Sequence, residues 1–301
     1  MQFTHTLWSA FALSIAITCT AAFADDVTAQ GEPYTFRDEP TSQPAAGGPS
    51  VEGGLVEYLA DRFSPHEPIY FLYGPDDPHV KFQISLKYQI FSPQGALQKA
   101  VPTVSGLYFA YTQQSFWDTG ADSGPFFDSS YKPEFLWLSQ FRKPDWIPGL
   151  SRFDLQAGLQ HESNGKGGDD SRSLNIAYIR PIFTFGDWEH ERGFFTTFAP
   201  RIWSYVGSLE DNPDLANYRG YGDVRLIMGW RYDLQLSATA RFGDEWDKIG
   251  LELNLSYPIG RFTGRSVDMY LYAQYYTGYG ESLIGYDENG DSFRIGLALV
   301  R

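Results

Sequence analysis

The sequence contains a single cysteine, and this residue, Cys19, lies in an N-terminal segment without any Asp, Glu, Lys or Arg. Residues 1–24 have an apolar centre and end in the small-residue pattern Ala22-Phe23-Ala24. These features predict a secretory signal peptide that is cleaved before Asp25. The mature chain would then have no cysteine, which excludes disulfide bonds and thiol catalysis.

Long apolar runs are also missing after this segment. None approaches the roughly 18 residues of a membrane helix, so any insertion into a membrane must use another structure. Basic residues are few, with 23 Lys and Arg against 37 Asp and Glu, and the formal charge of −14 argues against nucleic acid as a partner. Aromatic residues, in contrast, make up 17% of the chain, although its mean hydropathy is only −0.33. A polar chain so rich in aromatics indicates many half-buried surfaces.

Strict alternation of apolar and polar residues dominates the sequence after an irregular Gly- and Pro-rich extension at residues 25–65. In VKFQISLKYQI, residues 80–90, the apolar side chains take the even positions, and LELNLSY, residues 251–257, repeats the pattern. This two-residue period predicts strands with one apolar and one polar face. Twelve such segments start near residues 67, 80, 104, 132, 150, 171, 194, 222, 235, 248, 265 and 292.

Two architectures fit these strands: a soluble sandwich or barrel, and a transmembrane barrel. The segments are longer than the five or six residues usual in soluble strands. Several connections after odd-numbered segments are long, whereas several after even-numbered ones are short, such as GDWEHERG and GRFTGR. Aromatic residues crowd the segment ends, as in an interfacial girdle: Phe71, Tyr73, Phe116, Trp117, Trp137, Trp203, Tyr205, Trp230 and Tyr232. We therefore expect an all-β fold, a twelve-stranded antiparallel transmembrane β-barrel over residues 66–301, with both ends on the periplasmic side.

One hairpin concentrates chemically useful residues, LQHESNGKGGDDSRSLNIAYIR at residues 159–180. Parity places His161 and Ser163 on the outward, lipid-facing side, where polar groups are expensive unless they are used. If the two strands pair with a register sum of 336, Ser163 faces Ser173 and His161 faces Asn175.

This arrangement suits a hydroxyl nucleophile, because an imidazole can take the Ser163 proton while the Asn175 carbonyl orients the ring. An ordinary decorated turn remains the alternative. The loop from Lys166 to Ser171 carries oxygen donors of the kind that hard cations bind, although it could equally be a solvated turn. The other histidines of the mature chain, at positions 66, 79 and 190, have no comparable serine and asparagine partners.

The segment HESNGKGGDDSRSLN closely resembles the catalytic segment of the bacterial outer-membrane phospholipase A family, His-x-Ser-Asn-Gly followed by Ser-Arg-Ser-x-Asn. The resemblance extends in order through VKFQISLKYQIF, LYFAYTQQSFWD, the SGPF loop, DNPDLANYRGY and LYAQYYTGYGESLIGYD, over roughly residues 67–300. It implies a calcium-dependent (Ca2+) hydrolase of phospholipid acyl esters in the outer membrane, active as a homodimer.

The resemblance also implies roles for individual residues. Ser163 is the implied nucleophile, His161 the base, Asn175 the orienting residue and Gly165 an oxyanion-hole amide. The implied calcium ligands are the Ser171 hydroxyl, the Lys166 carbonyl and Ser123 of the partner subunit, and Gln113 is an implied dimer-interface residue. Gly168 stands where the family has an Asp, so a second calcium site would need Asp169 or Asp170.

Three functional hypotheses follow. The first is a phospholipase whose site lies on the outside of the barrel at the outer-leaflet boundary. The second is a non-catalytic barrel, a porin or a structural module, in which the hairpin is a surface loop. Inward polar residues such as Arg152, Asp154, Gln156, Glu252 and Asn254 would fill the lumen, which disfavours an open pore. A soluble secreted lipase is the third.

Overall fold

The computed structural model describes residues 62–92, 95–190, 192–244 and 247–301. The predicted signal peptide and most of the predicted extension lie outside the described residues. Strands dominate the described part, and their bounds are β1 (Phe63–Pro65), β2 (Ile69–Tyr73), β3 (Val80–Gln89), β4 (Leu107–Trp117), β5 (Phe126–Phe141), β6 (Leu150–Ser163), β7 (Ser173–Gly186), β8 (Phe194–Tyr205), β9 (Gly222–Trp230), β10 (Gln235–Phe242), β11 (Ile249–Pro258), β12 (Tyr270–Tyr279) and β13 (Asn289–Val300). The helical segments are short: α3 (Ala96–Ala100), η1 (Pro102–Gly106), η2 (Gly168–Asp170), α4 (Leu215–Arg219) and η3 (Ile259–Arg261).

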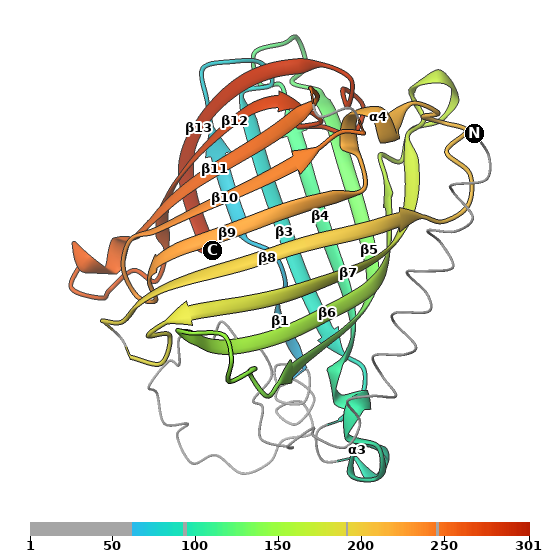
Figure 1. Ribbon diagram of the computed structural model, residues 1–301. Helices are drawn as coiled ribbons and strands as arrows, with labels where there is room; N and C mark the ends of the chain where they lie inside the picture. Colours follow the sequence, from blue (N-terminus) through green and yellow to red (C-terminus); the bar gives the residue numbers. More distant parts are fainter. Residues whose placement is uncertain (1–61, 93–94, 191, 245–246) are drawn as a thin grey trace, which may run out of the picture.

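The strands form one antiparallel sheet that closes on itself. Each strand from β2 to β13 pairs with its neighbours in sequence, and β13 pairs with β2, which closes the barrel (Figure 1). The three-residue β1 pairs with the same strand, β3, as β2 does, so β1 and β2 are two parts of one position in the barrel. The prediction of a twelve-stranded antiparallel barrel is therefore confirmed, and closure leaves no free sheet edge.

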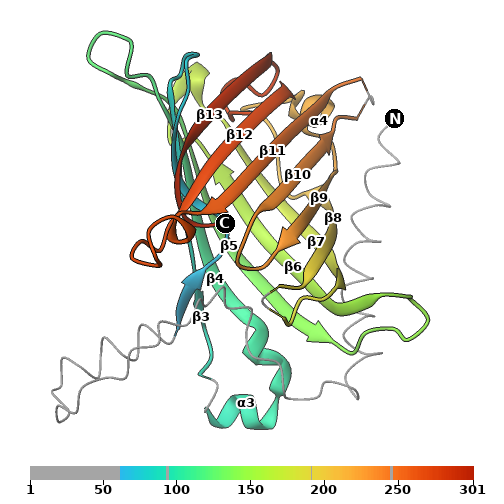
Figure 2. The ribbon, with the colours of Figure 1, turned by 90° about the vertical axis from the view of Figure 1, so that its left-hand side faces the viewer.

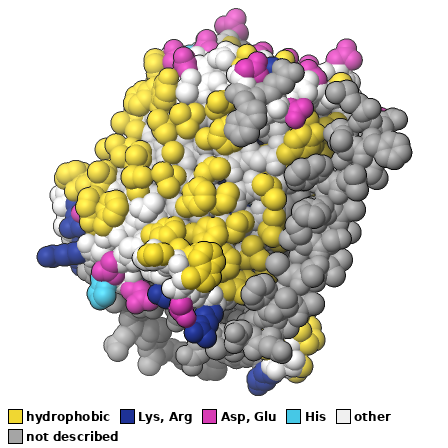
Figure 3. Space-filling view, viewed as in Figure 1, with side chains coloured by type: hydrophobic (Ala, Val, Ile, Leu, Met, Phe, Trp, Pro, Cys, Tyr) yellow, Lys and Arg dark blue, Asp and Glu magenta, His cyan; other side chains and the backbone are white. Residues whose placement is uncertain are grey.

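The barrel turns its apolar side chains outward and its polar ones inward. On β3, Ile84 and Leu86 are 48% and 42% exposed, while Lys81 and Ser85 are almost fully buried. Figure 3 shows the result as a continuous hydrophobic surface over the strands, with acidic side chains gathered along the upper rim. Because a soluble protein would have to expose this apolar area to water, the distribution is that of a barrel surrounded by lipid.

Ion pairs bridge the lumen. Glu67, in the short break between β1 and β2, lies 2.8 Å from Arg225 and 3.7 Å from Arg180 on distant strands. Lys81 lies 3.3 Å from Glu252, and a cavity of about 280 Å³ remains among these groups. The inward polar residues thus fill the interior with paired charges, as predicted.

Two details of the sequence prediction were wrong. Phe116 and Trp203, assigned to the aromatic girdle, are buried at 2% and 8% exposure. Phe116 lies under the ammonium of Lys81, and Trp203 lies beside the guanidinium of Arg201, so both rings serve cation–π contacts in the interior. Phe116 is followed by Trp117, and two adjacent aromatic residues at a strand end leave the parity ambiguous. Trp203 was assigned by its place near a strand end, without regard to its parity with the inward Arg201.

The second detail concerns strand ends and loops. β5 begins at Phe126, six residues before its predicted start, because a register shift between Phe116 and Trp117 hides the alternation. The connections after β3 and β11 are also long, and they contain α3 and η3, so the difference in loop length between the two rims is smaller than expected. Figure 2 shows α3 at the end of the barrel opposite to α4.

Within the described residues, no helix is long and apolar enough to cross a membrane.

Candidate active site

The β6–β7 hairpin has the predicted register. His161 pairs with Asn175 and Ser163 pairs with Ser173 across the ladder. The His161 Nδ1 and the Asn175 Oδ1 are 2.9 Å apart, within hydrogen-bond distance. Because the amide oxygen can only accept, this contact fixes Nδ1 as the protonated nitrogen and leaves Nε2 as an acceptor.

The inward neighbours on the same strand hold the outward pair in place. Glu162, between His161 and Ser163, is 5% exposed and lies 3.2 Å from Arg219 and 3.5 Å from Lys132 inside the barrel. Since successive side chains of a strand point to opposite faces, anchoring Glu162 in the lumen directs both of its neighbours outward.

Ser163 lies between two strands on the outer face. It pairs with Tyr131 on β5 and with Ser173 on β7. No hydrogen bond joins Ser163 to His161 within the described residues. Residues two positions apart on one strand face are about 6.8 Å apart along the strand, so the imidazole must turn toward the hydroxyl to contact it.

The loop between β6 and β7 is built around Asn164, which is 4% exposed. Its side-chain amide donates to the Asp170 carbonyl at 2.8 Å, and its side-chain oxygen accepts from the Arg172 amide at 3.0 Å. Gly165 follows with a positive φ of 68°, and a side chain at this position would come within 3.0 Å of the Tyr131 ring. Only glycine suits this position, where the chain turns directly beside Ser163.

The residues predicted to hold a cation divide into two places. Lys166 and Ser171 lie on the hairpin loop, and the Lys166 ammonium donates to the Phe127 carbonyl at 2.9 Å. The Ser171 hydroxyl donates at 3.2 Å to a carboxylate oxygen of Asp211, from the β8–β9 loop. Ser123 lies apart from them, on the exposed β4–β5 loop with a positive φ of 70°.

Asp211 and its neighbour Asn212 are site residues that the sequence analysis missed. The Ser173 hydroxyl donates to Asp211 at 3.0 Å, and the Ser173 amide donates to Asn212, which is fully buried, at 2.9 Å. Together with Ser171, these contacts fasten the β8–β9 loop to the hairpin. DNPDLANYRGY was noted only as part of the family resemblance, because nothing in its spacing shows which hairpin it will contact.

An apolar cluster inside the barrel end packs beneath the contact between the β8–β9 loop and the β6–β7 hairpin. It joins Leu215 of α4 and Leu283 of the β12–β13 loop, both fully buried, to residues of β7 and β8. Tyr286 of the same loop donates a hydrogen bond to Asp214. Burial and this carboxylate acceptor raise the pKa of the Tyr286 phenol well above its ordinary value, so the hydroxyl keeps its proton and its role as a donor.

The outer face beside the hairpin is hollowed and polar. A cavity of about 200 Å³ is lined by Gln113, Ser115, Phe126, Asp128, Ser129, Tyr131, Asn164 and Lys166. Gln113 has the same parity as the exposed Tyr111, whose hydroxyl donates to it at 3.2 Å. This notch adjoins Ser163 on a surface that is otherwise apolar, so it could admit the polar part of a lipid.

A transmembrane barrel that carries a serine, a histidine and an asparagine on its lipid-facing surface, beside a polar notch, defines a class of protein: a membrane-embedded lipid hydrolase. The family model described as phospholipase A1 matches residues 62–299. The chain belongs to this family, and it is a phospholipase of the bacterial outer membrane.

Curated relatives carry the same description. The phospholipase A1 of Escherichia coli K12 is 34% identical over 225 residues, which cover 73% of this chain and 69% of that protein. The phospholipase A1 of Klebsiella pneumoniae is 35% identical over 223 residues, covering 73% and 70%. That of Proteus vulgaris is 28% identical over 89% of this chain and 93% of its own.

Solved structures agree with the fold. Outer membrane phospholipase A from Escherichia coli superposes with a TM-score of 0.64 at 29% identity, covering 79% of this chain and 91% of that chain. An active-site mutant of the same enzyme, with an asparagine replaced by alanine, gives 0.62 at 28% identity over 78% and 90%. The Salmonella typhi enzyme, a dimer with bound calcium, gives 0.62 at 27% identity over 79% and 92%.

Proposed function

We propose that the chain is a calcium-dependent serine hydrolase of phospholipid acyl esters, with Ser163 as nucleophile, His161 as base and Asn175 as the orienting residue. The observation that carries the proposal is the 2.9 Å contact between His161 Nδ1 and Asn175 Oδ1, two register positions from Ser163 on the same lipid-facing side. An asparagine in the active site of the Escherichia coli enzyme is consistent with this role.

The reaction begins when the Ser163 oxygen attacks the ester carbonyl and its proton passes to His161 Nε2. The Nδ1 proton stays on the imidazole and donates to Asn175, which holds the ring in the productive tautomer. The tetrahedral oxyanion collapses as His161 returns the proton to the departing lyso-lipid oxygen. Water, deprotonated by the same imidazole, then releases the fatty acid from Ser163.

Gly165 contributes an amide to the oxyanion, because the chain turns at this residue immediately after the nucleophile. Asn164 keeps the turn rigid through its three side-chain hydrogen bonds within the loop. A site that is rigid before substrate arrives loses little energy to reorganisation when the charge develops.

The donor set near the nucleophile fits calcium. The Ser171 hydroxyl, the Lys166 carbonyl and the Asp211 carboxylate are oxygen ligands, which calcium prefers. Ser171 and Asp211 meet where the β6–β7 and β8–β9 loops touch, and Lys166 lies on the first of these loops. Bound calcium would supply positive charge next to the ester oxyanion. Asp211 would add an acidic ligand to this set, whereas Asp169 and Asp170, which a second calcium site would need, are both exposed.

A homodimer would complete this ligand set. Ser123 of the partner subunit would approach from an exposed loop, and Gln113 lies on an outward face bordered by the exposed rings of Tyr111 and Phe109. Two such faces in contact would form a seam that accepts acyl chains beside Ser163. The calcium-bound dimer of the Salmonella typhi enzyme supports this assembly.

Fatty-acid release from phospholipid–detergent micelles tests the proposal, with calcium and with EDTA. Ser163→Ala should lower the rate at least about 10³-fold, because the residual catalysis then comes from binding alone. Ser139→Ala is the matched control, since Ser139 is also an outward-facing strand serine but lies toward the other rim. Equal calcium-dependent rates for wild type and Ser163→Ala would reject the nucleophile.

A further inference from the structure

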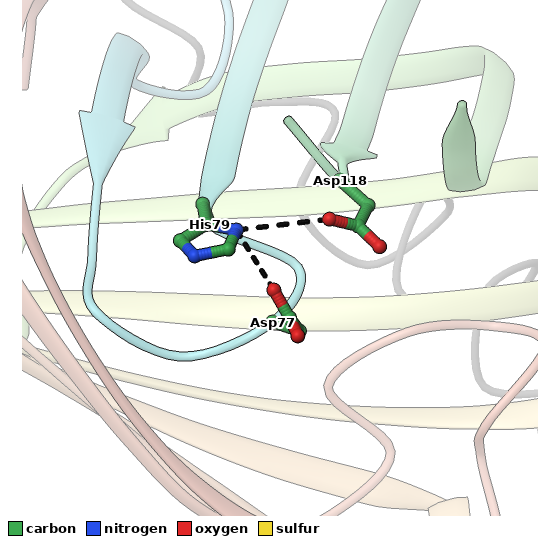
Figure 4. A group of neighbouring side chains, drawn as sticks. All are labelled: Asp77, His79 and Asp118. Carbon is green, nitrogen blue, oxygen red and sulfur yellow. Dashed lines mark ion pairs between the residues drawn. The ribbon is translucent and has the colours of Figure 1, made fainter. Parts of the chain in front are cut away.

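A second group of chemically useful side chains lies at the same rim, outside the site described above. Asp77 and His79 come from the connection between β2 and β3, and Asp118 follows the end of β4 (Figure 4). One atom of each side chain lies within 4.8 Å of the other two. In the sequence, His79 was set aside because it has no serine and asparagine partners comparable to those of His161.

The two carboxylates lie close to one nitrogen of the imidazole. His79 Nδ1 is 2.8 Å from an Asp77 oxygen and 3.7 Å from an Asp118 oxygen. This nitrogen is enclosed and has no hydrogen-bond partner, so neither carboxylate lies in the direction that an N–H would need. A buried polar atom that faces two carboxylates without a hydrogen bond requires an explanation.

His79 and Asp118 are held in place by their surroundings, whereas Asp77 is largely exposed. The His79 ring stacks on Tyr73, with centroids 5.8 Å apart, and Gly120 approaches so closely that a side chain there would come within 2.6 Å of the imidazole. The amides of Gly120 and Ala121 both donate to the Asp118 oxygen nearest His79. Such support of the ligands by their neighbours is usual in metal sites.

We propose that Asp77, His79 and Asp118 bind a divalent transition metal of the zinc type. In a tetrahedral zinc site with bonds of about 2.1 Å, ligand atoms are about 3.4 Å apart, and the two measured separations bracket that value. An imidazole nitrogen with two carboxylates selects zinc or a similar metal over calcium and magnesium, which prefer oxygen ligands alone. With three protein ligands, the fourth position is open to water.

The metal would join two outer loops. Asp77 and His79 belong to the loop before β3, and Asp118 begins the loop that carries Ser123. Occupancy would therefore stiffen the β4–β5 loop independently of lipid hydrolysis. This site shares no residue with the hairpin, so its occupancy does not depend on the proposed catalytic function.

Isothermal titration with Zn2+ tests the site, on untagged mature protein folded in detergent with excess calcium present. The Ser163→Ala protein serves as the parent, which keeps hydrolysis out of the measurement. We expect one zinc per chain, and His79→Asn and Asp118→Asn should each weaken binding at least about tenfold. Asp118→Asn retains the oxygen that caps the loop, so the fold should persist. His190→Asn is the control, because His190, at the other rim, lies 2.6 Å from Asp187 and forms no cluster with a second carboxylate among the described residues.

Hydrogen exchange provides a second measurement, on the same proteins. Zinc should slow exchange in residues 118–125 of the parent and leave the loop unchanged in His79→Asn. Zinc binding that survives both substitutions, or that calcium displaces, would overturn the proposal. So would the absence of any zinc binding by the parent protein.

Discussion

The two faces of strand β6 are built in opposite ways. Inward side chains are paired: Asp154 lies 2.7 Å from Arg152, and Glu162 contacts two cations. Outward side chains are mostly apolar and exposed, such as Leu159, whereas the last outward positions of the strand are occupied by His161 and Ser163. The inward face thus holds the paired charges that make the strand rigid, and the outward face carries the residues proposed to be catalytic.

This division explains how a site can be precise without being enclosed. A soluble enzyme orients its catalytic groups by packing them in a largely enclosed site, whereas the proposed catalytic groups of this protein lie on the outer surface. Here Glu162 anchors the backbone from behind, and Asn164 and Asp211 fix the adjoining loops. Substitutions on the two faces of β6 should therefore have separable effects on activity and on stability.

The largest effect should come from the outward face. His161→Ala removes the proposed general base, and we expect the rate of fatty-acid release to fall about 10³- to 10⁴-fold. The free energy of unfolding should change little, because the imidazole lies at the outer surface and its hydrogen bond within the described residues is the one with Asn175. Activity assays combined with urea unfolding in lipid vesicles check both statements. A large loss of stability would show that His161 is structural.

The inward face should behave in the opposite way. Glu162→Gln leaves the charges of Arg219 and Lys132 without their partner, and breaking such a buried pair costs about 3 kcal/mol. Tryptophan fluorescence during urea unfolding measures the loss, and the folded fraction should keep most of its activity. The control is Glu189→Gln in an exposed turn. An unchanged unfolding midpoint would mean that the lumen does not provide the rigidity inferred here.

Removing the contact between the β6–β7 and β8–β9 loops should have an intermediate effect. Asp211→Ala removes the acceptor for the Ser171 and Ser173 hydroxyls and one calcium ligand of the proposed set. We expect the calcium concentration for half-maximal activity to rise about tenfold, which corresponds to about 1.4 kcal/mol. Asp268→Ala, at the exposed surface of the other rim, is the control. Unchanged calcium dependence would remove Asp211 from the ligand set.

Much of this arrangement could be predicted from the sequence. Alternation gave the strands, and a single hairpin register gave the pairing of His161 with Asn175, since both depend on short-range geometry. Asp211 could not be found in this way, because its contact with Ser171 joins loops 40 residues apart and depends on how the barrel curves. The cluster of Asp77, His79 and Asp118 was missed for the same reason, as two separate loops must meet to form it.

The smallest effect should come from the contact between His190 and Asp187 in the exposed β7–β8 turn. Their hydrogen bond and opposite charges raise the pKa of His190 above its ordinary value and lower that of Asp187. The stabilisation from His190 is therefore lost as pH rises through its raised pKa, and that from Asp187 is lost as pH falls through its lowered pKa. Both side chains are charged only at pH values between these two pKa values.

An NMR titration of the His190 ring should show the raised pKa in wild type and a lower one in Asp187→Asn. Because both side chains are exposed to solvent, we expect the unfolding midpoint to remain nearly constant across this window. His161 differs in having a neutral amide partner, which orients the imidazole without adding a charge to it. Identical titrations in wild type and Asp187→Asn would show that the Asp187 contact does not persist in solution.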